Sequence, residues 1–132
     1  MSVVIDVNVL ISAFIFPSSK PALAVKKAFT NGTVNVSLEI IEELRYKILS
    51  DKFDKYAPFT IRALFIKEFE KRSEIKEVKT QVKFCRDPKD DKYLSIAKAA
   101  KADTIITGDK DLLVLHPFES ISIITPAEFL KL

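Results

Sequence analysis

Carboxylate side chains interrupt apolar segments of this sequence, and Asp6 is the most informative of them. Asp6 lies between Val3–Ile5 and Val9–Ile11, inside what would otherwise be a continuous piece of core. Burying an unpaired carboxylate is costly, so Asp6 needs a compensating partner. A metal ion would supply one, and so would backbone N–H groups if Asp6 caps a helix that begins near Val9. The position of Asp6 alone leaves both roles open.

Further acids stand in or beside other predicted elements. Glu43 lies in an amphipathic segment, Asp87, Asp90 and Asp91 lie at a helix start, and Asp109 and Asp111 follow the apolar run Thr104–Thr107. Turn and capping roles explain some of them. Carboxylates that converge repel one another by about 4 kcal/mol per pair at about 4 Å and an effective dielectric of about 20. A hard divalent cation relieves this repulsion, and oxygen ligands without His or Cys favour Mg²⁺ or Mn²⁺ over zinc. Such ions suit the hydrolysis of phosphodiesters.

Short apolar strands and amphipathic helices alternate along the chain, and these elements must position the acids. The predicted strands are Val3–Ile5, Thr33–Val36, a weak one around Ile75–Val78, Thr104–Thr107 and Ile121–Ile124; the predicted helices begin near Pro21, Ser37, Pro58, Asp87 and Thr125. The segment after Asp6 is expected to be a loop or a short helix. This alternation implies an α/β sandwich on a mainly parallel sheet. Function in such sheets gathers at the carboxyl ends of the strands, where Asp6 and Asp109 stand.

Length and composition limit the number of domains and the kinds of site and segment that the chain can contain. A chain of 132 residues with 48% hydrophobic and 30% charged residues fits one domain, residues 1–132, with one core. Cys85 is the only cysteine, which excludes an intramolecular disulfide, and only His116 could join it in a zinc site. No apolar stretch resembles a membrane span or a secretory signal. The cytoplasm is therefore the expected location.

Net charge is +3, and its distribution is uneven. Between positions 62 and 86 eight basic residues face four acids: Arg62, Lys67, Lys71, Arg72, Lys76, Lys79, Lys83 and Arg86 against Glu68, Glu70, Glu74 and Glu77. A local surplus of positive charge attracts polyanions such as nucleic acid. The alternative is a solvated helix face on which opposite charges pair.

Four segments resemble, in order, the motifs of the PIN domain family: Val4–Ser12, Ser37–Leu44, Asp87–Leu94 and Thr107–Leu113. Each motif is short, but four in the right order are specific. The likeness is greatest to the PIN domains assigned as toxins of toxin–antitoxin systems, the VapC-like ribonucleases. The resemblance implies a three-layer α/β/α fold with a parallel sheet. It also implies an endoribonuclease that uses Mg²⁺ or Mn²⁺, often forms a homodimer and is inhibited by a small antitoxin.

The resemblance also implies roles for individual residues. The acidic quartet would be Asp6, Glu43, Asp91 and Asp109, with Asn8 and Thr107 as polar supports and Asp111 as an auxiliary acid. Asp90 competes with Asp91 for the third position. Helix phase does not decide between them, and the spacing to the last motif favours Asp91.

Three other functions compete with the ribonuclease. A phosphatase of the haloacid dehalogenase type would use Asp6 as a nucleophile, but it requires a second Asp where this chain has Asn8. A non-catalytic module could bind RNA or protein on the same fold, although retention of all four acids argues against it. A nuclease for structured DNA needs additional elements for which the chain is too short.

Overall fold

Five strands form one fully parallel sheet in the computed structural model, which describes all 132 residues. The strands are β1 (Ser2–Ile5), β2 (Thr33–Val36), β3 (Glu74–Ile75), β4 (Thr104–Ile106) and β5 (Ser122–Ile124). Their order in the sheet is β3-β2-β1-β4-β5. The sheet confirms the predicted parallel α/β architecture.

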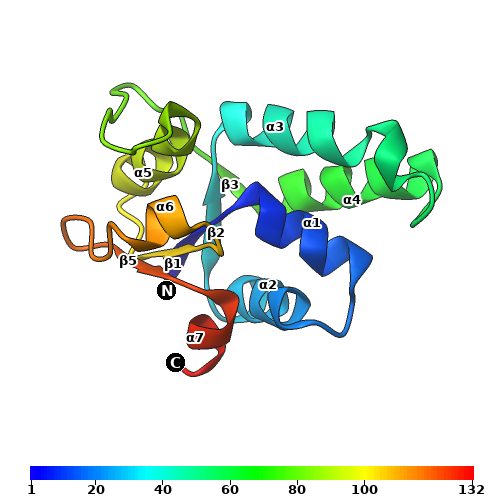
Figure 1. Ribbon diagram of the computed structural model, residues 1–132, viewed down its shortest axis with the longest axis horizontal. Coiled ribbons are helices and arrows are strands. Elements are labelled where there is room, and N and C mark those ends of the chain that lie inside the picture. The colour runs from blue at the N-terminus through cyan, green and yellow to red at the C-terminus, as the bar shows by residue number, and fades with distance from the viewer.

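Helices cover both faces of this sheet. They are α1 (Val7–Ile15), α2 (Lys20–Asn31), α3 (Leu38–Ile48), α4 (Phe59–Arg72), α5 (Asp91–Ala99), α6 (Lys110–Leu113) and α7 (Pro126–Leu130), with 3-10 turns η1 (Asp51–Phe53) and η2 (Pro88–Asp90). Helix α5 packs on β1, β2 and β4, and Figure 1 shows it on the opposite side of the sheet from α1 to α4. The three-layer α/β/α arrangement is thereby confirmed.

The central strand β1 is apolar from Val3 to Ile5 because helices bury both of its faces. Val3, Val4 and Ile5 are all buried, as expected for a strand inside a parallel sheet. The buried apolar side chains of strands and helices form one continuous core. Gly32, which ends α2, is needed for a close approach: a Cβ at this position would lie 2.5 Å from the carbonyl oxygen of Met1.

Two predicted elements differ from those observed. The weak strand expected around Ile75–Val78 is the shorter and earlier Glu74–Ile75, an exposed edge strand paired only with β2. The helix expected from Asp87 begins at Asp91, because the chain first makes the 3-10 turn η2. The segment after Asp6, expected as a loop or a short helix, is the nine-residue helix α1.

No single helix is long and apolar enough to cross a membrane. Helices α1 and α2 meet the length and composition criteria only when taken together, and the chain bends by 110° between them. The apolar composition of α1 reflects its place in the core, since Val7, Val9, Leu10, Ile11 and Ala13 are all buried.

Arg62 is buried, which corrects its assignment to the polyanion-attracting surplus. Its guanidinium donates hydrogen bonds to the carbonyl oxygens of Ile48 (2.9 Å), Ser50 (3.0 Å) and Ala57 (3.0 Å). It also forms an ion pair with Asp54. Arg62 therefore joins α4 to the connection between α3 and α4. The other seven basic residues of the 62–86 segment are exposed.

We expect Arg62→Met to lower the free energy of unfolding by about 3 kcal/mol, because three backbone carbonyl groups, the Ile48 carbonyl buried among them, and Asp54 lose their partner. Urea unfolding at pH 7 measures the change. Lys67→Met, an exposed substitution on the same helix, is the matched control and should change stability by less than about 0.5 kcal/mol. Equal effects of the two substitutions would contradict a structural role for Arg62.

Candidate metal centre

Asp6 ends β1 and begins α1, and its two carboxylate oxygens have different partners. One oxygen accepts a hydrogen bond from the Asn8 N–H at 2.9 Å, as the N-cap of α1. The other accepts from the Thr107 hydroxyl at 2.7 Å. The residue is 3% exposed. The capping role expected of Asp6 is therefore confirmed, and its metal-binding role stays a prediction.

Neighbouring parallel strands bring the fourth motif to Asp6. Ile5 on β1 pairs with Ile106 on β4, so the residues that follow these strands meet at one edge of the sheet. The Thr107 hydroxyl also accepts a hydrogen bond from the Asp109 N–H at 3.0 Å. Asp109 in turn caps the short helix α6, with its carboxylate accepting from the Asp111 N–H at 2.8 Å.

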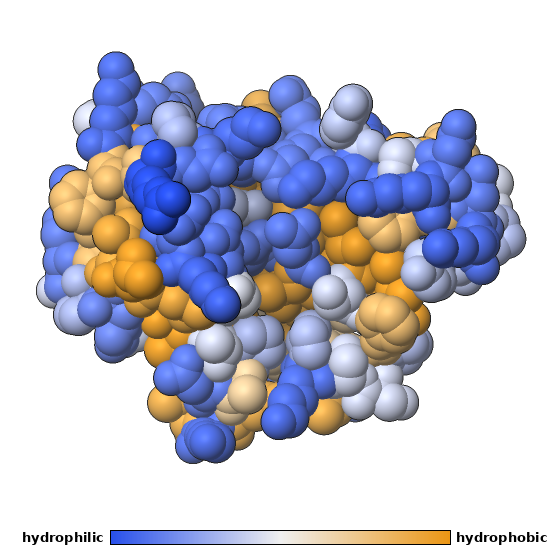
Figure 2. Space-filling model, in the orientation of Figure 1, coloured by the Kyte–Doolittle hydropathy of each residue, from blue (hydrophilic) through white to orange (hydrophobic).

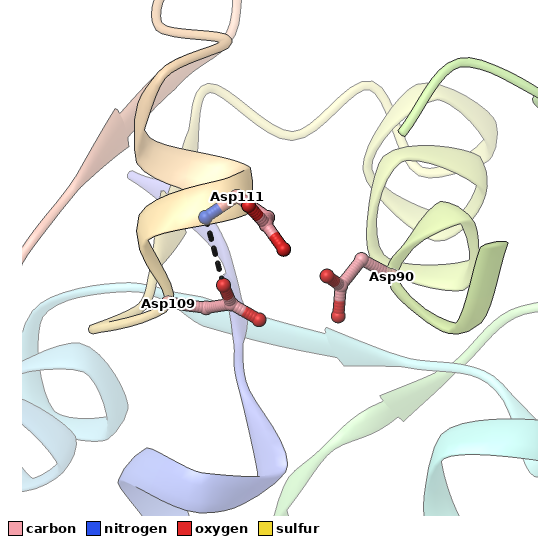
Figure 3. Close-up of side chains that lie close together, drawn as sticks. All are labelled: Asp90, Asp109 and Asp111. Carbon is pink, nitrogen blue, oxygen red and sulfur yellow. Dashed lines mark hydrogen bonds between the residues drawn. The ribbon is translucent and has the colours of Figure 1, made fainter. Parts of the chain in front are cut away.

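Asp90 lies across from Asp109 and Asp111. Figure 3 shows its carboxylate, carried by η2, pointing towards Asp109 and Asp111 on α6. One carboxylate oxygen from each of the three residues can be chosen so that all lie within 4.8 Å of one another. A cation between them would thus reach oxygen ligands from two elements that are far apart in sequence.

The electrostatics of Asp90 fit a role as a ligand of a cation. Its residue is 8% exposed, and its Oδ2 is buried without a hydrogen-bond partner. Burial raises the pKa of Asp90 to about 7, with the negative charges of Asp109, Asp87 and Asp6 adding to the shift. A buried, unpartnered carboxylate oxygen among acids is unfavourable without a compensating charge. The oxygen-only donor set fits Mg²⁺ or Mn²⁺.

Asp91 points away from this cluster. Its Oδ1 accepts hydrogen bonds from the N–H groups of Phe84 (3.0 Å) and Cys85 (2.7 Å). Burial raises the pKa of Asp91, but these two N–H groups outweigh it and lower the pKa. The cluster with Asp109 and Asp111 therefore contains Asp90 and not the predicted Asp91. The prediction took the segment as one helix from Asp87, whereas η2 turns Asp90 towards the sheet edge.

Glu43 on α3 lines the same hollow, but its charge is already compensated. Its oxygens pair with Lys92 Nζ at 2.5 Å and Lys47 Nζ at 3.2 Å, and the Tyr93 hydroxyl donates to it at 3.3 Å. Burial favours a higher pKa for Glu43, but the hydrogen bonds and charges of the two lysines outweigh it and lower the pKa. Glu43 is therefore ionised and held in place.

The acids and lysines surround a hollow of about 350 Å³ lined by Asp6, Asn8, Glu43, Lys47, Asp87, Lys89, Asp90, Lys92, Tyr93 and Asp109. Asn8 supports Asp6 through its backbone N–H, whereas its side chain accepts from Lys47. Sequence reasoning missed Lys92 and Tyr93. Their position directly after the acids, on the stripe of α5 that is otherwise apolar and buried, was the available signal.

Comparison with known proteins assigns the fold and the motifs to one family. The sequence model of the PIN domain matches residues 2–111. This chain belongs to the PIN domain family. An uncharacterized protein of Methanocaldococcus jannaschii is 36% identical to this PIN domain over 141 aligned positions, which cover 99% of this chain and 90% of the relative.

A solved structure shares the fold of this PIN domain. VapBC2 from Rickettsia felis, determined bound to a DNA fragment from its promoter, contains a chain that superposes with a TM-score of 0.65. The alignment covers 95% of this PIN domain and 98% of that chain at 15% sequence identity. At this identity the similarity is one of fold.

Asp90→Asn should stabilise the metal-free PIN domain at pH 8 by about 1 to 2 kcal/mol, and by less at pH 5. The folded-state pKa of Asp90, about 7, exceeds the unfolded value, so its contribution to stability falls as pH rises from about 4 through 7. Urea unfolding in EDTA measures the effect. Asp91→Asn, the matched control, should destabilise at pH 8, because its carboxylate is ionised and bonded. A destabilising effect of Asp90→Asn at pH 8 would contradict this account of Asp90.

Proposed function

We propose that this PIN domain is a Mg²⁺- or Mn²⁺-dependent endoribonuclease, the toxin of a toxin–antitoxin pair, that acts in the cytoplasm. The observation that carries the proposal is the buried, unpartnered oxygen of Asp90, which faces Asp109 and Asp111 at the edge where Asp6 ends β1. Membership of the PIN domain family supports the reaction class. The fold shared with a chain of VapBC2 supports an antitoxin partner. A homodimer is part of the proposal as well.

Three acids would hold the ion: Asp6, Asp90 and Asp109, with Asp111 as an auxiliary ligand. The bound ion would supply an activated water and offset the negative charge that develops on the phosphoryl oxygens. Thr107 fixes the orientation of Asp6 through its hydroxyl and that of the Asp109 backbone through its oxygen. Such support of ligands by neighbouring polar groups maintains both affinity and geometry.

Glu43 has a different task in this proposal. Because Lys92 and Lys47 hold it ionised at the wall of the hollow, it can accept a hydrogen bond from a water and orient that water for attack on phosphorus. The half-exposed Lys47 lies at the rim, where its charge favours a phosphate group entering the hollow. The hollow thus joins acids suited to a cation with lysines suited to the substrate.

The competing phosphatase function conflicts with Asn8, which stands where that function requires a second Asp. The side chain of Asn8 is an amide that cannot donate a carboxylic proton, and its oxygen accepts a hydrogen bond from Lys47. A non-catalytic module that binds RNA or protein offers no reason to keep Asp90 buried without a partner.

The test is Mn²⁺-dependent cleavage of a fluorescently labelled RNA by variants purified identically. Asp6→Asn, Asp90→Asn and Asp109→Asn should each reduce the rate by at least about 100-fold, because each removes an ionised ligand. Asp91→Asn, which lies next to Asp90 in sequence but outside the cluster, should reduce it by less than about tenfold.

A contaminating nuclease is the main source of error in this assay, because it would cut RNA equally in every preparation. With such a contaminant excluded, three Asn variants as active as the wild type would contradict the proposal. A loss with Asp91→Asn as large as that with Asp90→Asn would instead contradict the assignment of the third acid.

A further inference from the structure

Helices α1 and α3 run side by side away from the acidic hollow (Figure 1), and α1 packs against α3. Two contacts mark the ends of the strip between them. Near the hollow, Lys47 Nζ donates to the Asn8 side chain at 3.4 Å. At the far end, the rings of Phe16 and Tyr56 lie 6.5 Å apart in an edge-to-face arrangement. At about 1.5 Å per helical residue, the aromatic end is about 15 Å from Asp6.

The far end of this strip exposes aromatic rings to solvent. Phe16 is 56% exposed and Tyr56 is 48% exposed, although the two rings contact each other. The ring of Phe53 lies on another side of Tyr56, with its centroid 6.1 Å away. Figure 2 shows apolar surface beside the hydrophilic outer face of α3 in this half of the molecule. Phe16 and Tyr56 are therefore partly exposed at the surface and are not enclosed in the core.

Lysines accompany the rings. Lys52 lies over the ring of Phe53 at 5.1 Å, and Lys55 lies over the ring of Tyr56 at 5.2 Å. These two lysines outnumber the one free acid of residues 47–56, Asp51, since Asp54 is paired with the buried Arg62 and Lys47 with Glu43. Positive charges beside exposed aromatic faces are complementary to a nucleic acid strand with unpaired bases.

We propose that this strip, formed by Phe16, Tyr56, Lys47, Lys52 and Lys55, binds single-stranded RNA that extends from the cleavage site. The bases would stack on the two rings, and the phosphates would lie near the lysines. The inference rests on the proposed nuclease function. A strand stacked at about 3.4 Å per base crosses the 15 Å from Asp6 to Phe16 with about four nucleotides. Duplex RNA hides its base faces, so the surface selects unpaired strands.

The lysines of the strip favour RNA over a protein as its ligand. Lysine is depleted in the buried centre of protein interfaces, because its charge must be desolvated there. A second copy of this chain would have to bury Lys52 and Lys55 together with the rings that they cover. An RNA strand leaves the same lysines next to phosphates and solvent.

Fluorescence anisotropy in EDTA, where RNA is not cut, tests the strip. The probe is a labelled oligouridylate of 12 nucleotides, with a 12-base-pair RNA duplex for comparison. The double variant Phe16→Ala/Tyr56→Ala should bind the single strand at least about tenfold more weakly than the wild type and the duplex with little change. Phe16→Trp/Tyr56→Phe, which keeps the rings, should retain binding.

Phe84→Ala is the matched control. Phe84 is 58% exposed and forms a ring pair with Phe118 at 5.2 Å, but it lies outside the strip. Its variant should bind the single strand as the wild type does. Circular dichroism melting verifies that all variants fold, so that a loss of binding reports on the rings alone.

The proposal is overturned if the wild type does not bind the single strand or if the double variant binds it equally well. It is also overturned if sedimentation shows that the double variant loses self-association while its RNA binding is kept, since the rings would then join two copies of the chain. Cleavage separates the two proposals: ring-dependent binding by a wild type that does not cut RNA with Mn²⁺ would refute the nuclease and leave the strip standing.

Discussion

The hydroxyl group of Thr107 joins the two halves of the acidic site, and the rest of the site depends on it. It donates to the buried carboxylate of Asp6 and accepts from the backbone N–H of Asp109. This is only possible because β1 and β4 are neighbours in the sheet, with Ile5 in register with Ile106. The pairing of two apolar strands therefore fixes the separation of two acids that are about a hundred positions apart in the chain.

Of the acids around the hollow, Glu43 has basic partners and Asp90 has none. Glu43 is matched by Lys92 and Lys47, so its ionised form is stable without any ligand. Asp90 has no such partner, and burial with neighbouring acids raises its pKa to about 7. The compensated charge thus lies at Glu43 on α3, and the need for a cation lies towards α6. This asymmetry distinguishes a metal centre from a general cluster of surface acids.

Periodicity and motif order predicted the parallel sheet and placed Asp6 and Asp109 at its carboxyl edge, because both acids follow strands. The pairing of β1 with β4, which brings the two acids together, was not predicted. They did not predict Asp90, since the choice against Asp91 depends on a 3-10 turn that leaves little trace in residue types. Long side chains were equally hard to place. Arg62 resembled a surface charge and is buried, and Lys92, to which no role was assigned from the sequence, is an ion-pair partner of Glu43. Such placements depend on packing between distant segments.

The central claim is that Asp6, Asp90 and Asp109 hold a divalent ion. The most direct measurement is anomalous scattering from crystals of the wild-type PIN domain soaked in Mn²⁺, with data collected on both sides of the manganese absorption edge. We expect one anomalous peak between these three carboxylates, within reach of Asp111, and none beside Asp91. A peak bound through Asp91, or no peak in the hollow at saturating Mn²⁺, would contradict the account.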